Sequence, residues 1–175
     1  MKKLIIILFV LFYFANIAFS QDTIKNKPKV QHTVFVELFG HSWWIYNIAY
    51  DCTLILREKH KLAFTNGIQY LPNDDFKRHT LSISPQISYL YGKKHHLEVG
   101  VGFYFDCYFS KKLLNTTYAI PFNIGYRYQR NNGGFFGRAF ILPAYLIKFG
   151  WPFNETPFIL WGGFSLGYTF KNKKL

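Results

Sequence analysis

The sequence predicts an all-β fold, an up-and-down antiparallel transmembrane β-barrel of about eight strands. Apolar residues alternate with small or polar ones through most of the chain, which is the pattern of strands with one oily face and one polar face. Aromatic residues make up 21% of the 175 residues, charged residues only 17%, and the mean hydropathy is 0.00. No stretch after the N terminus is long enough for a membrane helix, so a membrane protein of this composition has to be a barrel.

Residues 1–20 are expected to be a secretory signal peptide. Lys2 and Lys3 precede an apolar run, and Ala18-Phe19-Ser20 forms a small-x-small cleavage site. The alternative, an uncleaved anchor, is disfavoured because the apolar run has about half of the ~20 residues that a span requires. We therefore expect a flexible lead-in over residues 21–31, the barrel over residues 32–170 and a basic tail over residues 171–175.

The alternation divides the barrel into its expected strands. They comprise residues 33–40, 44–56, 61–70, 79–91, 96–109, a sixth around 118–128, 135–147 and 157–170. The last is the clearest, because Phe158, Leu160 and Phe164 share one parity while small or polar residues hold much of the other. The seventh is the least regular, since Phe140 and Leu142 fall on the same face as Arg138.

The connections alternate in length. Those after the second, fourth and sixth strands are short, and Asn131-Asn132-Gly133-Gly134 carries the Asn-Gly signal of a tight hairpin. Those after the third, fifth and seventh strands are longer, over residues 71–78, 110–115 and 148–156, and Pro72 indicates a loop in the first of them. The connection after the first strand, around residues 41–43, is the exception, since it is nearly as short as a turn. This rhythm is typical of short periplasmic turns and longer surface loops, with both termini in the periplasm.

Alternation alone does not say which face is inside, and a secreted lipocalin-like barrel would have the apolar face inward. Three observations favour the membrane arrangement. The small or polar face suits the crowded lumen of a narrow barrel, and aromatic residues such as Tyr70, Tyr89 and Tyr126 gather near strand ends, where interfacial girdles form. The last strand also ends on Phe170, similar to the C-terminal signal read by the outer-membrane assembly machinery.

The polar face predicts a structural ion network in the lumen. Counting back from the Asn132-Gly133 turn places Arg127 opposite Arg138, a repulsive pair unless a carboxylate lies between them. Glu98 has a similar height on the neighbouring strand, and we expect it to compensate both arginines together with a carboxylate from across the barrel. The expected lumenal residues are Glu37, Asp51, Glu98, Asp106, Arg127 and Arg138.

No catalytic, cofactor or metal site is predicted. Cys52 and Cys107 fall on the lipid face of non-adjacent strands, too far apart for a disulfide. The sharpest enzyme hypothesis is a lipid-modifying barrel, a lipid A deacylase or acyltransferase, in which His41-Ser42 with Glu37 would be the reactive group. Adjacent residues in a strand point to opposite faces, which disfavours a nucleophile and base pair at His41 and Ser42.

The formal charge of +12 comes mainly from turns and tails. Nucleic acid is not expected as a partner of an exported chain, whereas flanking lysines suit contact with anionic lipid head groups or a solvated rim. The expected partners are outer-membrane lipid and, during biogenesis, the assembly machinery.

Several stretches resemble a widespread, largely uncharacterised family of small outer-membrane β-barrel proteins of Gram-negative bacteria. They are residues 36–40 followed by 46–51, residues 97–102, residues 124–129 with 133–135, and residues 161–168. The resemblance implies a barrel in the outer membrane and brings no activity or catalytic residue. His41-Ser42-Trp43-Trp44 departs from the Gly-rich connection of that family.

From these observations we expect a monomer in the outer membrane with a structural or surface-interaction role, without catalysis and without an open pore, since about eight strands leave a lumen filled by side chains. The lipid-modifying enzyme and the lipocalin-like binder are the alternatives. The sequence names no ligand for the surface loops.

Overall fold

The structure, a computed structural model, describes residues 29–41, 46–73, 78–110, 114–148 and 157–171. The expected signal peptide, most of the lead-in and most of the basic tail lie outside the described residues. The strands are β1 (Lys29–Leu38), β2 (Tyr46–Ile55), β3 (His60–Asn73), β4 (Arg78–Gly92), β5 (His95–Gly102), β6 (Tyr104–Ser110), β7 (Leu114–Gln129), β8 (Gly134–Lys148) and β9 (Phe158–Thr169). Among the described residues, no helix is long and apolar enough to cross a membrane.

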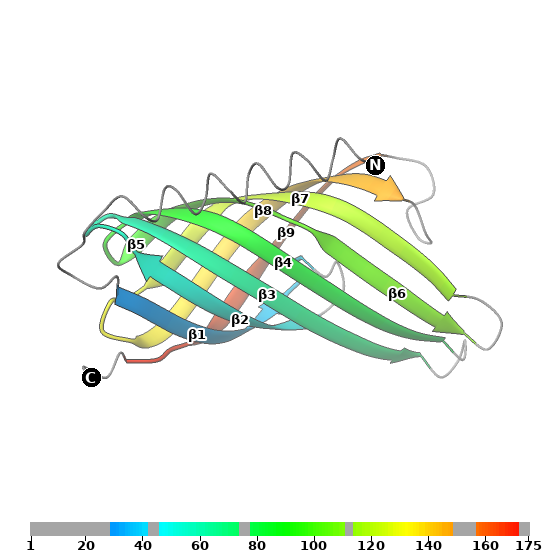
Figure 1. The fold of residues 1–175 in the computed structure, drawn as a ribbon, viewed down its shortest axis with the longest axis horizontal. Helices are drawn as coiled ribbons and strands as arrows, with labels where there is room; N and C mark the ends of the chain where they lie inside the picture. The colour runs from blue at the N-terminus through cyan, green and yellow to red at the C-terminus, as the bar shows by residue number, and fades with distance from the viewer. Residues whose placement is uncertain (1–28, 42–45, 74–77, 111–113, 149–156, 172–175) are drawn as a thin grey trace, which may run out of the picture.

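The strands close into an antiparallel barrel (Figure 1). Each strand pairs with its neighbours in the chain, and β1 pairs with β9 from Thr33↔Thr169 to Leu38↔Phe164, which joins the two ends of the sheet. The segments β5 and β6 both lie between β4 and β7 and form one strand interrupted at Phe103. The barrel therefore has eight strands, as the sequence predicts.

The two ends of the barrel differ. At one, here called the turn end, short connections join β2 to β3, β4 to β5 and β7 to β8. The first strand, β1, begins at this end and the last, β9, ends there (Figure 1). Gly133 in the last of these turns has φ of 81°, a left-handed backbone that favours glycine, and its N–H donates to the Arg130 carbonyl at 3.1 Å. The opposite end is called the loop end.

The apolar faces of the strands point outward. Side chains such as Ile48, Leu97 and Leu160 are 58%, 57% and 66% exposed, while their polar neighbours Asn47, Glu98 and Ser165 are buried in the lumen. Asn66 is a polar exception on the outer wall. Because the oily face is outside, the inverted arrangement of a lipocalin-like binder is contradicted.

Several strand boundaries differ from the sequence prediction. The barrel begins at Lys29, so the end of the expected lead-in belongs to β1, where Gln31 is buried and its amide donates to the Arg130 carbonyl. The expected loop over residues 71–78 is shorter, since β3 continues through Pro72 to Asn73. Proline is tolerated there because β2 pairs with β3 only as far as Ile68, so Pro72 has a single strand neighbour, in β4. The expected loop over residues 110–115 is also shorter, since Leu114 and Asn115 belong to β7.

Candidate functional site

The most elaborate polar arrangement in the described chain is an ion network in the lumen. Arg127 on β7 and Arg138 on β8 are paired residues of adjacent strands, and both side chains are fully buried. Two guanidinium groups this close would repel each other without counter-ions. Carboxylates from three other strands surround them.

Arg127 lies between Glu98 and Asp51. Its Nε donates to Glu98 Oε2 at 2.8 Å and a terminal nitrogen to Glu98 Oε1 at 2.9 Å, a bidentate pair, while the other terminal nitrogen donates to Asp51 Oδ2 at 3.1 Å. Asp51 also accepts hydrogen bonds from the Thr53 and Thr65 hydroxyls at 2.5 and 2.7 Å. These bonds satisfy the oxygens of a carboxylate that is out of reach of solvent.

Arg138 bridges the same Glu98 to Glu37 on β1. One terminal nitrogen donates to Glu98 Oε1 at 3.3 Å, and the other forms a short hydrogen bond with Glu37 Oε2. Glu98 is therefore shared by both arginines, and it also accepts a hydrogen bond from the Asn123 amide at 2.9 Å. The register explains this position, because Glu98 pairs with Gly125, two residues from Arg127 on β7.

Aromatic rings separate the network from other parts of the lumen. The Arg138 guanidinium lies over the rings of Phe140 and Phe35, 4.4 and 5.1 Å from their centroids, and Arg127 lies 5.3 Å from that of Phe136. Phe35 and Phe136 stack on one another. Cation–π contact adds to ion pairing here, and burial among aromatic rings strengthens each charged interaction.

His41 is a member of the network that the sequence did not indicate. After β1 the chain turns inward at Phe39, whose φ of 55° is left-handed and unusual for a bulky residue. This turn brings the His41 backbone N–H to 2.5 Å from Glu37 Oε1 and its Nδ1 to 3.0 Å from the same oxygen. His41 is 3% exposed, and its Nε2 has no hydrogen-bond partner among the described residues.

The charges of this site nearly balance. Three carboxylates, Glu37, Asp51 and Glu98, face the two arginines. His41 is the remaining described group in ion-pair contact with the cluster that is able to carry positive charge. The arrangement ties β1, β2, β5, β7 and β8 together through side chains, so it is suited to fixing the shape of the barrel.

Asp106 does not join the network. It lies on β6, beyond the interruption at Phe103 and toward the loop end, where it accepts a hydrogen bond from the Ser82 hydroxyl at 2.9 Å. The sequence placed Asp106 on the lumenal face among the residues of the ion network, and the structure buries it in the lumen but apart from the arginines. Sequence parity specifies the face of a residue, but not its distance along the barrel from residues on other strands.

The lumen on either side of the network is filled by different side chains. Toward the loop end, Ala144 and Leu146 of β8 form an apolar cluster with Tyr104 and Ala119, and Leu142 of the same strand is also buried. This explains the irregular alternation of β8, since apart from Arg138 its inner face carries apolar side chains. Toward the turn end, the buried Lys61 donates to Asn131 Oδ1 at 2.6 Å, and the Thr33 and Thr169 hydroxyls lie 3.0 Å apart across the β1–β9 seam.

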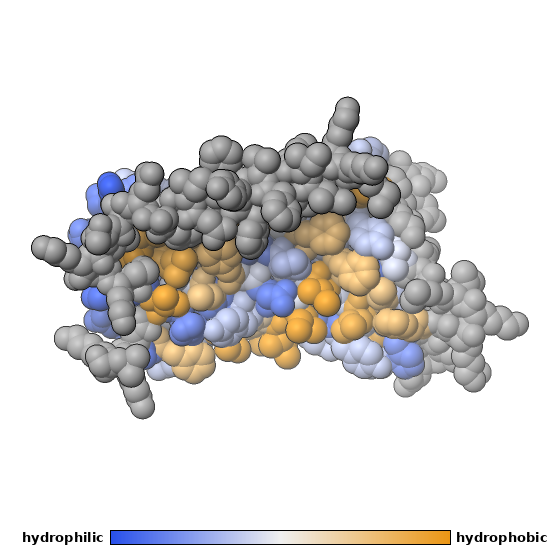
Figure 2. Space-filling view, in the orientation of Figure 1, coloured by the Kyte–Doolittle hydropathy of each residue, from blue (hydrophilic) through white to orange (hydrophobic). Residues whose placement is uncertain are grey.

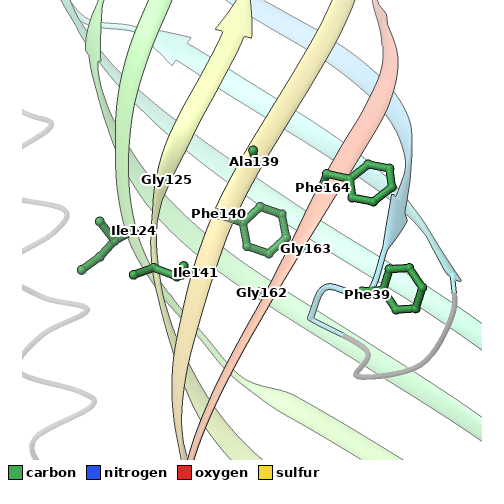
Figure 3. A pocket seen from close by; sticks show the side chains of 9 residues that line it. All are labelled: Phe39, Ile124, Gly125, Ala139, Phe140, Ile141, Gly162, Gly163 and Phe164. Carbon is green, nitrogen blue, oxygen red and sulfur yellow. The ribbon is translucent and has the colours of Figure 1, made fainter.

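An apolar groove lies on the wall formed by β7, β8 and β9 (Figure 3). It is lined by Phe39, Ile124, Gly125, Ala139, Phe140, Ile141, Gly162, Gly163 and Phe164. These residues supply no side chain able to ligate a metal or act as acid or base. Within the described chain, no group of three or more histidine, cysteine or acidic residues is placed to hold a metal ion, and Cys52 and Cys107 are free thiols.

Of the residues considered for catalysis, the structure brings Glu37 and His41 together, whereas Ser42 lies outside the described residues. The spacing of Glu37 and His41, four residues apart, was visible in the sequence. A regular strand would have pointed the two side chains to one face but too far apart for contact. The turn at Phe39 brings the two side chains within hydrogen-bond distance, and no sequence signal indicates this turn.

Comparisons with known proteins identify the fold only. No protein-family model matches the chain, and no curated protein matches it. Among solved structures, the chain is similar to the N-terminal β-barrel domain of Pseudomonas aeruginosa OprF, with 15% identity and a TM-score of 0.50 over 82% of this chain and all of that one. It also matches Neisserial surface protein A, NspA, with 12% identity and a TM-score of 0.49 over 84% of this chain and all of that one. The OprF likeness supports a closed eight-stranded barrel.

Proposed function

We propose that this chain is an integral outer-membrane β-barrel protein with a structural or surface-interaction role, without catalysis and without an open pore. The observation that carries this proposal is the closed barrel with its apolar side chains outside. Large hydrophobic residues on every strand are 36 to 66% exposed, far more contiguous apolar surface than a soluble monomer presents. A bilayer is the solvent that such a wall fits.

The outer surface is consistent with this placement. Figure 2 shows apolar residues over much of the visible wall, with hydrophilic residues at both ends and a few in the middle. Tyrosines near the strand ends, such as Tyr70, Tyr89 and Tyr126, are about half exposed on the same wall, as in an interfacial aromatic girdle.

The lumen supports a structural role rather than a transport role. Arg127, Glu98 and Asp51 are 0% exposed, and the rings of Phe35 and Phe136 lie against the guanidinium groups. Five strands contribute charged side chains to one hydrogen-bonded cluster that crosses the lumen, so the barrel interior acts as a polar core. Interaction with partners then falls to the loop-end connections, whose centres lie outside the described residues.

Fractionation of cells that express the full chain tests this proposal. Recovery in the outer-membrane fraction, resistant to extraction by high salt and carbonate, is the expected result. Recovery in the soluble periplasm would overturn it. Conductance of planar bilayers containing the purified protein tests the closed lumen: stable channel openings in the wild type would contradict a plugged barrel.

One observation favours a second candidate function, a lipid-modifying enzyme. The His41 imidazole has Nδ1 on the Glu37 carboxylate and a buried Nε2 with no described partner, the arrangement of a base held by an orienting carboxylate. Mass spectra of lipid A from cells with and without the gene test this candidate. A mass change that is lost in His41→Ala would support the enzyme, and identical spectra would remove it.

A further inference from the structure

Four of the histidines lie on the outer wall, each beside a tyrosine of an adjacent strand. The Nδ1 atoms of His32 and His95 lie 2.6 and 2.5 Å from the hydroxyls of Tyr50 and Tyr126, and His60 makes a short bond with Tyr89. The fourth pair, Tyr70 with His79, has a distance of 3.1 Å and lies toward the loop end.

The three pairs at the turn end repeat one geometry. The residues directly opposite His32, His60 and His95 are Cys52, Tyr91 and Tyr128, and in each case the bonded tyrosine is two positions before that residue. Each histidine is near the start of a strand that leads away from the turn end, on β1, β3 and β5. On β8, the fourth strand that leads away from the turn end, Phe135 occupies the position of the histidine, and the residue directly opposite it on β9 is Tyr168.

In each of the three pairs, the contact with the tyrosine hydroxyl involves Nδ1 of the imidazole. In the tautomer in which the hydroxyl donates to Nδ1, the hydrogen of a neutral imidazole is on Nε2. In that tautomer each pair satisfies a tyrosine hydroxyl beside the apolar wall and offers a hydrogen-bond donor at the histidine Nε2.

The same rim is strongly basic. Its exposed charged side chains in the described residues are Lys29, Arg57, Glu58, Lys59, Lys93, Lys94, Arg130 and Lys171. Glu58 is the acidic member, and it is paired with Lys93 at 2.5 Å, a contact that lowers the pKa of the Glu58 carboxyl. The surplus of positive charge is closest to two of the three histidines, since Lys59 precedes His60 and Lys94 precedes His95, while Lys29 is three residues before His32.

We propose that the three histidine–tyrosine pairs at the turn end are binding sites for the phosphate of anionic phospholipids, which would be the lipids of the periplasmic leaflet. The proposal rests on the proposed membrane placement. A phospholipid whose acyl chains lie along the apolar wall would place its glycerol esters and then its phosphate at the rim. The imidazole Nε2–H donates to a phosphate oxygen, the adjacent lysines supply charge, and the tyrosine hydroxyl holds the ring in place.

Native mass spectrometry of the full chain folded in detergent tests this site. The probes are phosphatidylglycerol, diacylglycerol with the same chains and inorganic phosphate. The histidine variant is His32→Phe/His60→Phe/His95→Phe, which places at each site the phenylalanine that β8 already has. The tyrosine variant is Tyr50→Phe/Tyr89→Phe/Tyr126→Phe, which keeps the imidazoles. Tyr145→Phe/Tyr168→Phe is the control, since it removes two outward hydroxyls that belong to none of the pairs.

We expect the wild type and the control to retain phosphatidylglycerol, the histidine variant to bind it about tenfold more weakly, and the tyrosine variant to fall between them. Equal retention of phosphatidylglycerol by the wild type and the histidine variant would overturn the proposal. Retention of diacylglycerol by the wild type as strong as that of phosphatidylglycerol would also overturn it. Displacement of the lipid by millimolar inorganic phosphate would identify a site for free phosphate instead.

Gel mobility of the same samples, boiled and unboiled, separates the two proposals. A heat-dependent shift with no lipid selectivity contradicts the phosphate site alone, whereas loss of the shift in the wild type contradicts the barrel. If the histidine variant does not fold, the tyrosine variant carries the test. Retention of phosphatidylglycerol by the tyrosine variant at the level of the wild type would then contradict the proposal.

Discussion

At the scale of single residues, Glu98 is the centre of the lumenal network. Its two carboxylate oxygens accept hydrogen bonds from Arg127, Arg138 and Asn123, and the side chain is 0% exposed. A buried guanidinium that loses its counter-ion retains its desolvation penalty without the compensating attraction. Glu98 compensates two such groups.

Glu98→Gln keeps the shape of the side chain and removes its charge. We expect the free energy of unfolding to fall by about 3 kcal/mol, because both arginines keep only one carboxylate each. Urea unfolding followed by tryptophan fluorescence measures the change. The matched control is Glu58→Gln, which removes an exposed ion pair with Lys93 and should alter stability far less than Glu98→Gln does. Equal effects of the two substitutions would contradict a stabilising network.

At the scale of elements, the end of β1 determines where His41 lies. Gly40 and Gly163 allow the chain to cross close to β9: a Cβ on Gly163 would lie 2.7 Å from both the Gly40 Cα and the Leu38 carbonyl oxygen. These neighbours are backbone atoms, so they are not free to move aside as a side chain would be. The inward turn at Phe39 depends on this close packing.

Gly163→Ala should therefore destabilise the barrel by about 1–3 kcal/mol, the range for overpacking. Gly162→Ala is the control on the same strand, since its Cβ would meet the Phe140 carbonyl oxygen at 3.1 Å and otherwise only the Ile141 Cα at 3.9 Å. Thermal unfolding in detergent compares the two. An alanine at position 163 that is tolerated as well as one at position 162 would show that the β1 end is not packed against β9 in this way.

The alternation of side chains predicted most of the strands, but not their details. The parity of Phe158, Leu160 and Phe164 correctly placed them outside, and the hairpin at Asn132-Gly133 fixed the opposition of Arg127 and Arg138. Pro72 was misleading because a strand with one neighbour tolerates proline. The position of His41 could not be predicted, because it depends on the left-handed turn at Phe39. The histidine–tyrosine pairs could not be predicted either, because they depend on the register between strands rather than on local sequence.

At the scale of the whole molecule, closure depends on the seam between the first and last strands. Thr33 pairs with Thr169, and their hydroxyl oxygens are 3.0 Å apart in the lumen. The two residues are separated by most of the chain, so their contact is a direct consequence of the barrel. An open sheet would leave both strands with unpaired edges, which lipid does not tolerate.

A cross-link tests this seam. In a Cys52→Ala/Cys107→Ala background, Thr33→Cys/Thr169→Cys should form a disulfide in the oxidising periplasm. The boiled, unreduced protein would then migrate differently from the reduced one, because the chain is circularised. Thr33→Cys/Ser165→Cys is the control: Ser165 is four residues from Thr169 along β9, about 13 Å, beyond the reach of a disulfide. Cross-linking of the control pair and not of the first pair would contradict the register.

The most direct test of the account is the electrophoretic mobility of the protein from the membrane fraction, boiled and unboiled in detergent. A closed barrel in which each strand is paired on both sides resists the detergent until it is heated. We predict a heat-dependent shift in mobility for the wild type. Identical mobility of the boiled and unboiled samples, with the protein recovered in the soluble periplasm, would contradict a membrane barrel.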